Sequence, residues 1–321
     1  MLYLNESDIE SIGMKWEELF CQIEAALECV CKNDFSQPIK PYLRYKNPKN
    51  RIIAMPAYVG GNFNVSGIKW IASFPDNVKN HIPRAHSVTV LNNADTGEPL
   101  CIVNTARLSI IRTASVTGVM IKHFSQEREM NGVTLGIIGW GPIGQCHFKM
   151  CTEAFGEKIS QIFLYDKRPI DRESINPVYR DKVHIADSWE KAYEQSDIFI
   201  TCTVSDAPYI DKKPKAGALL LNVSLRDFKT SVYEYVKSSI IVDDWEEVCR
   251  EGTDIEMMHI EKGLSKEDTR SMADFILRNG MKSCRSNEPV MFNPMGMAVF
   301  DISTGCYYMR KALELGVGTK L

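Results

Sequence analysis

Residues 133–155 constrain the fold of this chain more than any other segment. A β-rich apolar run at 133–138 leads directly into the turn Gly139-Trp-Gly-Pro-Ile-Gly144, and a helix-compatible segment follows to Phe155. Interleaved with helical segments, more short apolar runs follow at 159–165, 198–203, 218–223 and 239–242. Such runs are typical of a parallel sheet covered on both faces. We therefore predict an α/β fold with a doubly wound parallel sheet.

The segments on either side of this region have a different character. Residues 16–30 carry apolar side chains at helical spacing. Residues 38–101 change to short β-like runs separated by turn-forming clusters, which predicts an antiparallel sheet with strands near 51–55, 67–73 and 87–91. Helical spacing returns at 107–124 and at 296–315. The last helix suggests that the C-terminus completes the N-terminal sheet domain.

The glycine turn has the form that a dinucleotide requires. Gly139 permits the tight turn, Gly141 lets the backbone approach a pyrophosphate, and Gly144 allows the helix to pack closely on the strand. Pro142 and Ile143 then open the helix, whose free N–H groups face the diphosphate. The turn therefore predicts a Rossmann dinucleotide site. A purely structural turn is the alternative.

Asp166 bears on which dinucleotide is bound. It ends the second apolar run of the parallel sheet, 22 positions after Gly144, where its carboxylate can accept hydrogen bonds from both ribose hydroxyls and would repel a 2′-phosphate. This favours NAD. Lys167 and Arg168 follow directly and can hold a 2′-phosphate, so NADP stays open. Flavin proteins usually carry such a turn close to the N-terminus, which disfavours FAD.

The charge of the chain is unevenly distributed. The formal net charge is −3, but residues 37–112 contain ten Lys and Arg against three Asp and Glu, a local charge of +7, so the remainder carries −10. A basic domain beside a nucleotide-binding domain indicates a small substrate with several carboxylates or phosphates. A nucleic-acid partner is disfavoured, because the basic segment lacks regularly interleaved aromatic residues and has the pattern of buried strands.

Three of these cations lie within apolar sequence, where a charge is costly to bury without an anion. They are Arg44, Lys69 and Arg112. The sequence leaves two explanations open for each: a carboxylate of the substrate, or a structural salt bridge.

Composition limits the setting of the protein. No stretch approaches the roughly 20 apolar residues of a membrane span, and residues 1–10 are acidic where a signal peptide would be basic, so we expect a cytoplasmic protein with no membrane partner. The ten cysteines include no C-x-x-C pair and no nearby histidine cluster, so we expect no metal.

Several short blocks resemble the ornithine cyclodeaminase and mu-crystallin family, and the resemblance extends over essentially the whole chain. They are Met55-Pro56, Gly67-Ile-Lys69, Phe74-Pro-Asp-Asn77, Thr96-Gly-Glu-Pro99, Arg112-Thr-Ala114 and the glycine turn. The resemblance implies a Rossmann domain at 126–293, inserted into a mixed α+β substrate-binding and dimerisation domain formed by 1–125 and 294–321. It also implies a homodimer.

The same resemblance assigns roles to individual residues. Asp227, in Asn222-Val-Ser-Leu-Arg-Asp227, matches the catalytic acid of the family, with a helix N-cap as the alternative, and Lys69 is a second catalytic candidate. The expected substrate-binding residues are Lys40, Arg44, Met55, Lys69, Arg84 and Arg112. The expected cofactor-binding residues are Gly139, Gly141, Pro142, Ile143, Gly144, Asp166, Lys167, Thr203, Ser224 and Met297.

Longer strings are similar to one branch of the family, which makes L-2,3-diaminopropionate for siderophores and peptide antibiotics. They lie at 33–44, 51–56, 201–210, 242–245 and 293–298. This similarity implies NAD-dependent oxidation of N-(2-amino-2-carboxyethyl)-L-glutamate to 2-oxoglutarate and L-2,3-diaminopropionate. The three carboxylates of that substrate agree with the +7 segment.

Other activities of the family stay open as alternatives. Ornithine-cyclising members have a Glu two positions before the Met of Met-Pro, and Ile53 stands there in this chain, which disfavours a substrate with a distal ammonium. Another amino or imino acid oxidoreductase, such as an alanine dehydrogenase or a ketimine reductase, is the main alternative. A non-catalytic, crystallin-like binding protein is another.

Overall fold

The computed structural model describes residues 1–321, which form two compact units. The first unit combines Met1–Val116 with Gly296–Leu321, and the second is Thr117–Met295. Helix α3 (Arg107–Glu127) begins in the first unit and ends in the second. None of the helices combines the length and the apolar composition that a bilayer span requires.

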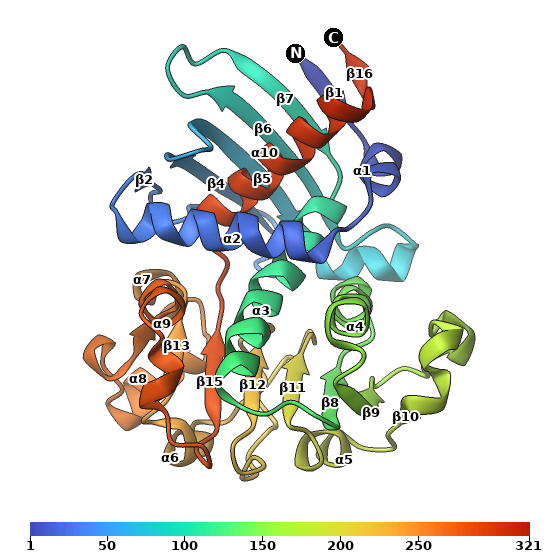
Figure 1. Cartoon of the computed structure of the whole chain (residues 1–321), viewed down its shortest axis with the longest axis vertical. Coiled ribbons are helices and arrows are strands. Elements are labelled where there is room, and N and C mark those ends of the chain that lie inside the picture. The colour runs from blue at the N-terminus through green and yellow to red at the C-terminus, as the bar shows by residue number, and fades with distance from the viewer. The chain divides into compact units, whose positions relative to one another are not determined.

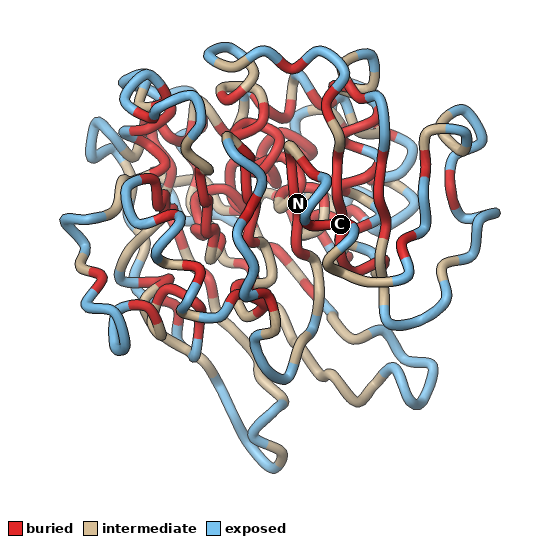
Figure 2. The backbone as a smooth tube through the Cα atoms, turned by 90° about the horizontal axis from the view of Figure 1, so that it is seen from below, coloured by how far each residue is buried: buried red, intermediate tan, exposed pale blue.

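The first unit is built on a mostly antiparallel sheet. Strands β4, β5, β6 and β7 pair antiparallel in sequence order, which confirms the predicted antiparallel sheet. Strand β1 adds to β7 in parallel and β16 to β1, so the two chain ends lie side by side (Figure 2). The strands are β1 (Leu2–Leu4), β2 (Phe35–Ser36), β3 (Tyr42–Leu43), β4 (Arg51–Val59), β5 (Val65–Ser73), β6 (Ala85–Asn93), β7 (Pro99–Asn104) and β16 (Thr319–Lys320).

The helices of this unit lie on one face of the sheet (Figure 1). Helix α10 (Ala298–Leu315) packs against β4, β5 and β6 and against α2 (Trp16–Cys31), and the short α1 (Glu6–Ile12) also contacts it. Every residue of α10 from Ala298 to Met309 is buried, because the sheet covers one side of the helix and α2 the other. The helical spacing at 16–30 and 296–315 predicted both helices.

The alternation of side chains along β5 places a charge in an unusual position. Successive residues of a strand point to opposite faces, and Gly67 lies against Ile302 of α10, so Lys69 also faces α10. Ile68 and Trp70 point to the outer face, where Trp70 is 44% exposed. Lysine is almost never fully buried without a partner, so this position requires a counter-charge on α10.

The second unit is a doubly wound parallel sheet, as predicted. All its strand pairs are parallel, in the order β10-β9-β8-β11-β12-β15-β13-β14. The chain runs outward from β8 to β10 and then returns to β11 on the other side of β8, which makes the carboxyl ends of β8 and β11 the topological switch point. The strands are β8 (Val133–Ile138), β9 (Ile159–Tyr165), β10 (Val183–Ile185), β11 (Ile198–Thr201), β12 (Leu219–Asn222), β13 (Ile240–Val242), β14 (Arg270–Ser271) and β15 (Val290–Asn293).

Helices connect most of these strands, whose residues are largely buried. Figure 2 shows exposed residues mainly in the outlying loops. The α-helices are α4 (Pro142–Phe155), α5 (Trp189–Glu194), α6 (Tyr233–Val236), α7 (Trp245–Val248), α8 (Asp254–Lys262) and α9 (Met272–Leu277). The 3₁₀ helices of the whole chain are η1 (Pro75–Asn80), η2 (Arg172–Ser174), η3 (Pro177–Lys182), η4 (Thr230–Val232), η5 (Lys266–Asp268) and η6 (Gly280–Ser283). Strand β15 was not predicted, because its four residues follow a polar segment without a repeating pattern.

Candidate functional site

The glycine turn after β8 has the shape of a dinucleotide cradle. Gly139 has φ +94°, which favours glycine, and α4 begins at Pro142 with Gly141 as its N-cap. A Cβ on Gly144 would lie 1.9 Å from the carbonyl oxygen of Gly139, so helix and turn are in direct contact there. A Cβ on Gly141 would meet nothing within 4 Å. The turn is thus closed toward the protein and open at Gly141, where a pyrophosphate would approach. Ile143 lies in the first turn of α4 and is partly exposed.

Asp166 is held against this turn. Its Oδ2 accepts a hydrogen bond from the backbone N–H of Trp140 at 2.7 Å, and its Oδ1 accepts one from the N–H of Arg168 at 2.8 Å. The two bonds fix the carboxylate at the end of β9 and leave acceptor capacity for ribose hydroxyls. Lys167 and Arg168 are exposed. The residues present therefore fit a dinucleotide without a 2′-phosphate.

Asp227 is a buried carboxylate at the same edge of the sheet. Thr203 Oγ1 donates to its Oδ1 at 2.5 Å, and Ser224 Oγ donates to its Oδ2. Its backbone carbonyl accepts from the N–H groups of Tyr209 and Ile210. Burial raises the pKa of Asp227, while the hydrogen bonds from Ser224 and Thr203 oppose this increase. A carboxyl group with a raised pKa, held in one orientation by two hydroxyls, has the chemistry that an acid or a base requires.

The N-cap alternative for Asp227 does not hold. The next helical turn, η4, begins at Thr230 with Lys229 at its N-cap, so Asp227 caps no helix. Thr203 and Ser224 were predicted to bind the cofactor, and the structure directs their hydroxyls to Asp227. A Cβ on Gly139 would lie 3.0 Å from the backbone nitrogen of Thr203. The Asp227 cluster and the glycine turn are therefore immediate neighbours.

The first unit contains a buried cluster of cations around one carboxylate. Lys69 Nζ lies 2.8 Å from Asp301 Oδ1, and Arg112 Nε donates to the same oxygen at 2.8 Å. Lys69 also donates to Ser109 Oγ at 3.3 Å. All three charged side chains are buried. Asp301, on α10, is the counter-charge that β5 requires, and the sequence did not single it out.

A single carboxylate leaves this cluster electrostatically positive. The pKa of Lys69 is lowered to about 7, chiefly by burial and also by the nearby Arg112 and Lys40, against the attraction of Asp301. Burial alone would raise the pKa of Asp301, but Arg112 and Lys69 hold it below its usual range. Asp301 Oδ2 has no hydrogen-bond partner. Because three cations surround one carboxylate, the cluster has an excess of positive charge that can bind a further anion.

Gly296 brings Lys40 to this cluster. Lys40 Nζ donates to the carbonyl oxygen of Gly296 at 2.9 Å. A Cβ on Gly296, which has φ +87°, would lie 2.6 Å from Nη1 of Arg112. Any other residue would displace the guanidinium. In the sequence, Asn293-Pro-Met-Gly296 indicated only a similarity to one branch of the family. Its role in packing against Arg112 was not predicted.

The three other predicted substrate residues, and Met297, which was predicted to bind the cofactor, are placed differently. Met55 is buried and pairs with Lys69 across β4 and β5. Arg44 is exposed, with its guanidinium 4.9 Å from the centre of the Tyr42 ring, and Arg84 is half-buried. Met297 belongs to the first unit, where it is buried as the N-cap of α10. None of these four assignments is tested by the geometry, and each stays a prediction.

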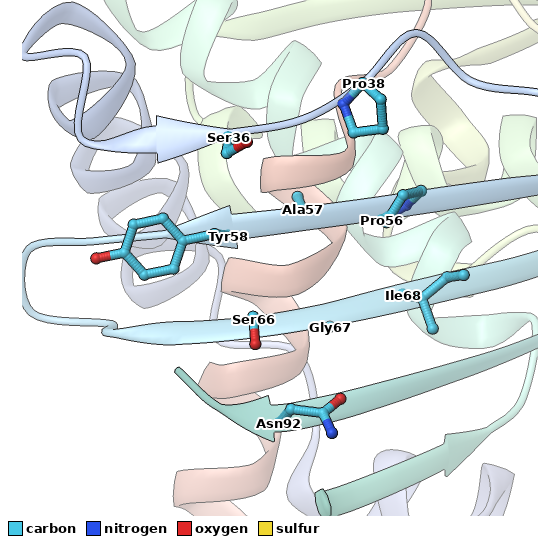
Figure 3. Close-up of a pocket in the computed structure, with 9 residues that line it drawn as sticks. All are labelled: Ser36, Pro38, Pro56, Ala57, Tyr58, Ser66, Gly67, Ile68 and Asn92. Carbon is cyan, nitrogen blue, oxygen red and sulfur yellow. The ribbon is translucent and has the colours of Figure 1, made fainter. Parts of the chain in front are cut away.

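Two surface hollows lie away from these residues. One, of about 350 Å³, is on the outer face of the first unit's sheet and is lined by Pro56, Tyr58, Ile68 and Asn92 among others (Figure 3). The other, of about 320 Å³, is at the amino ends of the parallel strands and includes Arg128 and Asp197. Neither contains a predicted catalytic residue. No group of three or more His, Cys, Asp or Glu side chains is arranged to hold a metal ion.

The doubly wound sheet, its glycine turn and Asp166 define a dinucleotide-binding protein of the Rossmann class. The model of the ornithine cyclodeaminase/mu-crystallin family matches residues 3–314, and the chain belongs to this family. It is 34% identical to the N-((2S)-2-amino-2-carboxyethyl)-L-glutamate dehydrogenase of Staphylococcus aureus over an alignment of 339 positions, which covers 100% of this chain and 98% of that protein.

Solved structures share the fold. The Δ¹-pyrroline-2-carboxylate reductase of Thermococcus litoralis, in complex with NADH and L-proline, superposes with a TM-score of 0.88 at 24% identity, covering 100% of both chains. An archaeal alanine dehydrogenase, a dimer with bound NAD, superposes with a TM-score of 0.81 at 22% identity, covering 100% of this chain and 98% of the other. The fold of this chain is thus shared with a reductase and a dehydrogenase.

Two glycine substitutions separate folding of the turn from binding of the cofactor. Gly144→Ala forces a methyl group against the carbonyl of Gly139, so we expect a lower melting temperature and loss of NADH binding. Gly141→Ala meets no protein atom, so we expect an unchanged melting temperature with NADH affinity reduced roughly tenfold, about 1.4 kcal/mol. Thermal unfolding and NADH fluorescence titration measure both. Wild-type affinity in Gly141→Ala would show that the pyrophosphate does not approach this residue.

Proposed function

We propose that this chain catalyses the NAD-dependent oxidative hydrolysis of N-(2-amino-2-carboxyethyl)-L-glutamate to 2-oxoglutarate and L-2,3-diaminopropionate. The observation that carries the proposal is the buried group of Lys40, Lys69 and Arg112, in which two cations share the single carboxylate of Asp301. A substrate with three carboxylates supplies the anions that such a group can bind. The full-length similarity to the staphylococcal dehydrogenase supports the same reaction.

The more general assignment does not depend on this substrate. The chain is an NAD-dependent oxidoreductase that acts on a CH–NH group. We assign Gly139, Gly141 and Gly144 to the pyrophosphate and Asp166 to the adenosine ribose, which the geometry of the turn and the position of the Asp166 carboxylate support. NAD, when bound, supplies the acceptor for a hydride from the substrate.

The overall reaction consumes one water. The glutamate Cα–N bond of the substrate is oxidised to an imine, water adds to its carbon, and the C–N bond then breaks to give the keto acid and the free amine. One hydride and one proton leave in total. Removal of that proton from the amine, and of the proton from water, requires a base, for which we assign Asp227. Its carboxylate is held by Thr203 and Ser224.

The cations of the first unit have separate tasks. Arg112 uses Nε for Asp301, which leaves its terminal nitrogens to bind a substrate carboxylate as a pair. Lys69, with its pKa lowered to about 7 by burial, can give a proton to the departing nitrogen at neutral pH. Lys40 is assigned to a second carboxylate. Arg44 and Arg84, which are more exposed, are assigned to the third carboxylate.

Ile53 favours a substrate that carries no positive charge at the end distal to the reacting amine. It lies two residues before Met55 in β4 and therefore on the same face of the sheet. A distal ammonium would need a carboxylate at such a position, and an aliphatic side chain offers none. Ornithine is therefore not the substrate that we propose.

Product analysis tests the proposed reaction directly. Purified protein with NAD and N-(2-amino-2-carboxyethyl)-L-glutamate is expected to form NADH, 2-oxoglutarate and 2,3-diaminopropionate in equal amounts, measured by absorbance and mass spectrometry. Alanine, proline and ornithine serve as competing substrates in parallel reactions. Faster NADH formation from one of these would assign the chain to a different reaction of the family.

Asp227→Asn tests the assigned base. It keeps the size of the side chain but removes its basicity, so we expect kcat to fall by about 10²–10⁴-fold with NADH affinity within about twofold of wild type. Wild-type kcat is expected to fall as the pH is lowered through the raised pKa of Asp227, because only the ionised carboxylate accepts a proton. An unchanged rate in Asp227→Asn would remove this residue from the mechanism.

We also propose that the protein is a homodimer formed through the outer face of the first unit's sheet. The helices of this unit lie on the opposite face, and Figure 3 shows α10 behind the strands that carry Pro56, Tyr58 and Ile68. With the 44% exposed Trp70, these side chains form a half-buried apolar surface. The archaeal alanine dehydrogenase of the same fold is a dimer.

A single charge on this surface tests the dimer. Trp70→Glu places a carboxylate in the proposed interface, so we expect a monomer by sedimentation velocity where the wild type is a dimer. Val178→Glu is a control, because Val178 is 77% exposed and lies in the other unit. A Trp70→Glu dimer of wild-type stability would exclude this face as the interface.

A further inference from the structure

A chain of buried polar side chains crosses the carboxyl ends of three central strands. Strands β11, β12 and β15 end in Thr201, Asn222 and Asn293, all fully buried. Thr201 Oγ1 donates to Asn222 Oδ1 at 3.3 Å, and Asn222 Nδ2 donates to Asn293 Oδ1 at 2.8 Å. Buried polar groups cost free energy unless they are hydrogen-bonded. Because three adjacent strands end in buried residues that hydrogen-bond to one another, we expect this network to have a structural or functional role.

The network leads to Asp254, the first residue of α8. Asn222 Nδ2 donates to Asp254 Oδ2 at 2.9 Å. The same oxygen accepts the backbone N–H groups of Asp227 and Phe228, each at 3.2 Å. Asp254 itself is fixed by the start of α8, where Thr253 is the N-cap and a carboxylate is favoured by the helix dipole. Asp254 therefore fixes the backbone N–H groups of Asp227 and Phe228, and so the segment that carries the Asp227 carboxylate.

The turn that Asp254 holds does not form easily by itself. Leu225 has φ +62°, a left-handed conformation that is unfavourable for a residue with a branched side chain. Its N–H donates to Asn222 Oδ1 at 3.1 Å, and its carbonyl oxygen accepts the N–H of Asp254 at 2.8 Å. Asn222 and Asp254 thus clamp the turn from two sides, and the turn directs Asp227 toward Thr203 and Ser224.

We infer that Asp254 is a positioning residue, which accepts the backbone N–H of Asp227 and so fixes the direction of the Asp227 carboxylate. The inference rests on the proposed function, in which Asp227 is the base. Asp254 touches neither the glycine turn nor the hydroxyls that hold Asp227. Its Oδ1 is buried with no hydrogen-bond partner. A buried oxygen without a partner costs free energy. The hydrogen bonds that Oδ2 accepts from Asn222 and from the backbone of Asp227 and Phe228 explain why an aspartate occupies this position.

The electrostatics agree with this geometry. The pKa of Asp254 is raised to about 7, chiefly by burial and also by the neighbouring Asp227, against the hydrogen bonds from Asn222 and from the backbone of Phe228. The hydrogen bonds that hold the turn need an acceptor oxygen, and an amide oxygen offers one as a carboxylate does. Asparagine at this position is therefore expected to preserve the positioning, and alanine to abolish it.

Four variants test the inference, with the amino acid that the wild type oxidises fastest as substrate. Asp254→Ala is expected to lower kcat by about 10- to 100-fold, because a small misplacement of a reacting group has effects of this order. KM and NADH affinity are expected to stay within about twofold. Asp254→Asn is expected to recover kcat to within about threefold of wild type, since an amide oxygen can still accept the N–H of Asp227.

Asp197→Ala is the matched control. Asp197 Oδ2 also accepts a backbone N–H, from Thr134 at 2.9 Å, in a part-buried hydrogen bond at the amino end of the sheet. We expect it to lower the melting temperature with kcat unchanged. Equal loss of kcat in Asp197→Ala, or in Asp254→Asn, would overturn the positioning role, because the effect would then follow general stability or charge.

Asp227→Asn, the fourth variant, separates this inference from the proposed function. If Asp227→Asn retains kcat, the assigned base is wrong. If Asp227→Asn is inactive while Asp254→Ala has wild-type kcat, only the positioning role is wrong. Hydrogen exchange of the segment 224–228, measured by mass spectrometry, tests the clamp without any activity: we expect faster exchange in Asp254→Ala alone, and unchanged exchange overturns the inference. Should Asp254→Ala fail to fold, Asp254→Ser, whose hydroxyl is too short for these bonds, replaces it.

Discussion

The pairing of Lys69 with Asp301 is the interaction on which the first unit depends. Lys69 occupies a core-facing position in the middle of the sheet, and a buried ammonium without a counter-charge would cost several kcal/mol. Its counter-charge lies 232 positions later in the chain, on α10. The first unit must therefore include both chain ends, and the nucleotide-binding unit is inserted between them. Arg112 shares the same oxygen, so one carboxylate organises two cations.

The two units tune their ionisable groups by the same physical effect with opposite results. Burial disfavours the charged form of any group, so it lowers the pKa of Lys69 to about 7 and raises the pKa of Asp254 to about 7. Asp227 is shifted in the same direction as Asp254, but the hydrogen bonds from Ser224 and Thr203 limit the effect. The pKa values of a lysine and an aspartate normally lie far apart, and burial brings those of Lys69 and Asp254 toward neutral pH.

The sequence predicted those features that depend on neighbouring residues. The glycine turn, Asp166 and the helices α2 and α10 each have a local pattern, and the structure confirms the doubly wound sheet that followed from them. Asp301 and Asp254 have no such pattern, because an acidic residue near the start of a helix is ordinary and its partners lie far away in the chain. Thr203 and Ser224 were associated with the cofactor, and the structure shows their hydroxyls in contact with Asp227. The Thr203 contact joins the loops after β11 and β12, which no local sequence pattern predicts, whereas Ser224 lies in the same turn as Asp227.

The position of α10 in the chain has a consequence for folding during synthesis. The nucleotide-binding unit is continuous, so all of its strands have been made before α10 leaves the ribosome. The first unit lacks α10, with the Asp301 carboxylate, and β16 until residues 298–320 have been made, and until then the ammonium of Lys69 lacks its counter-charge. The order of maturation is thus reversed with respect to the order of translation. The first unit, whose synthesis begins before that of the nucleotide-binding unit, is therefore completed after it.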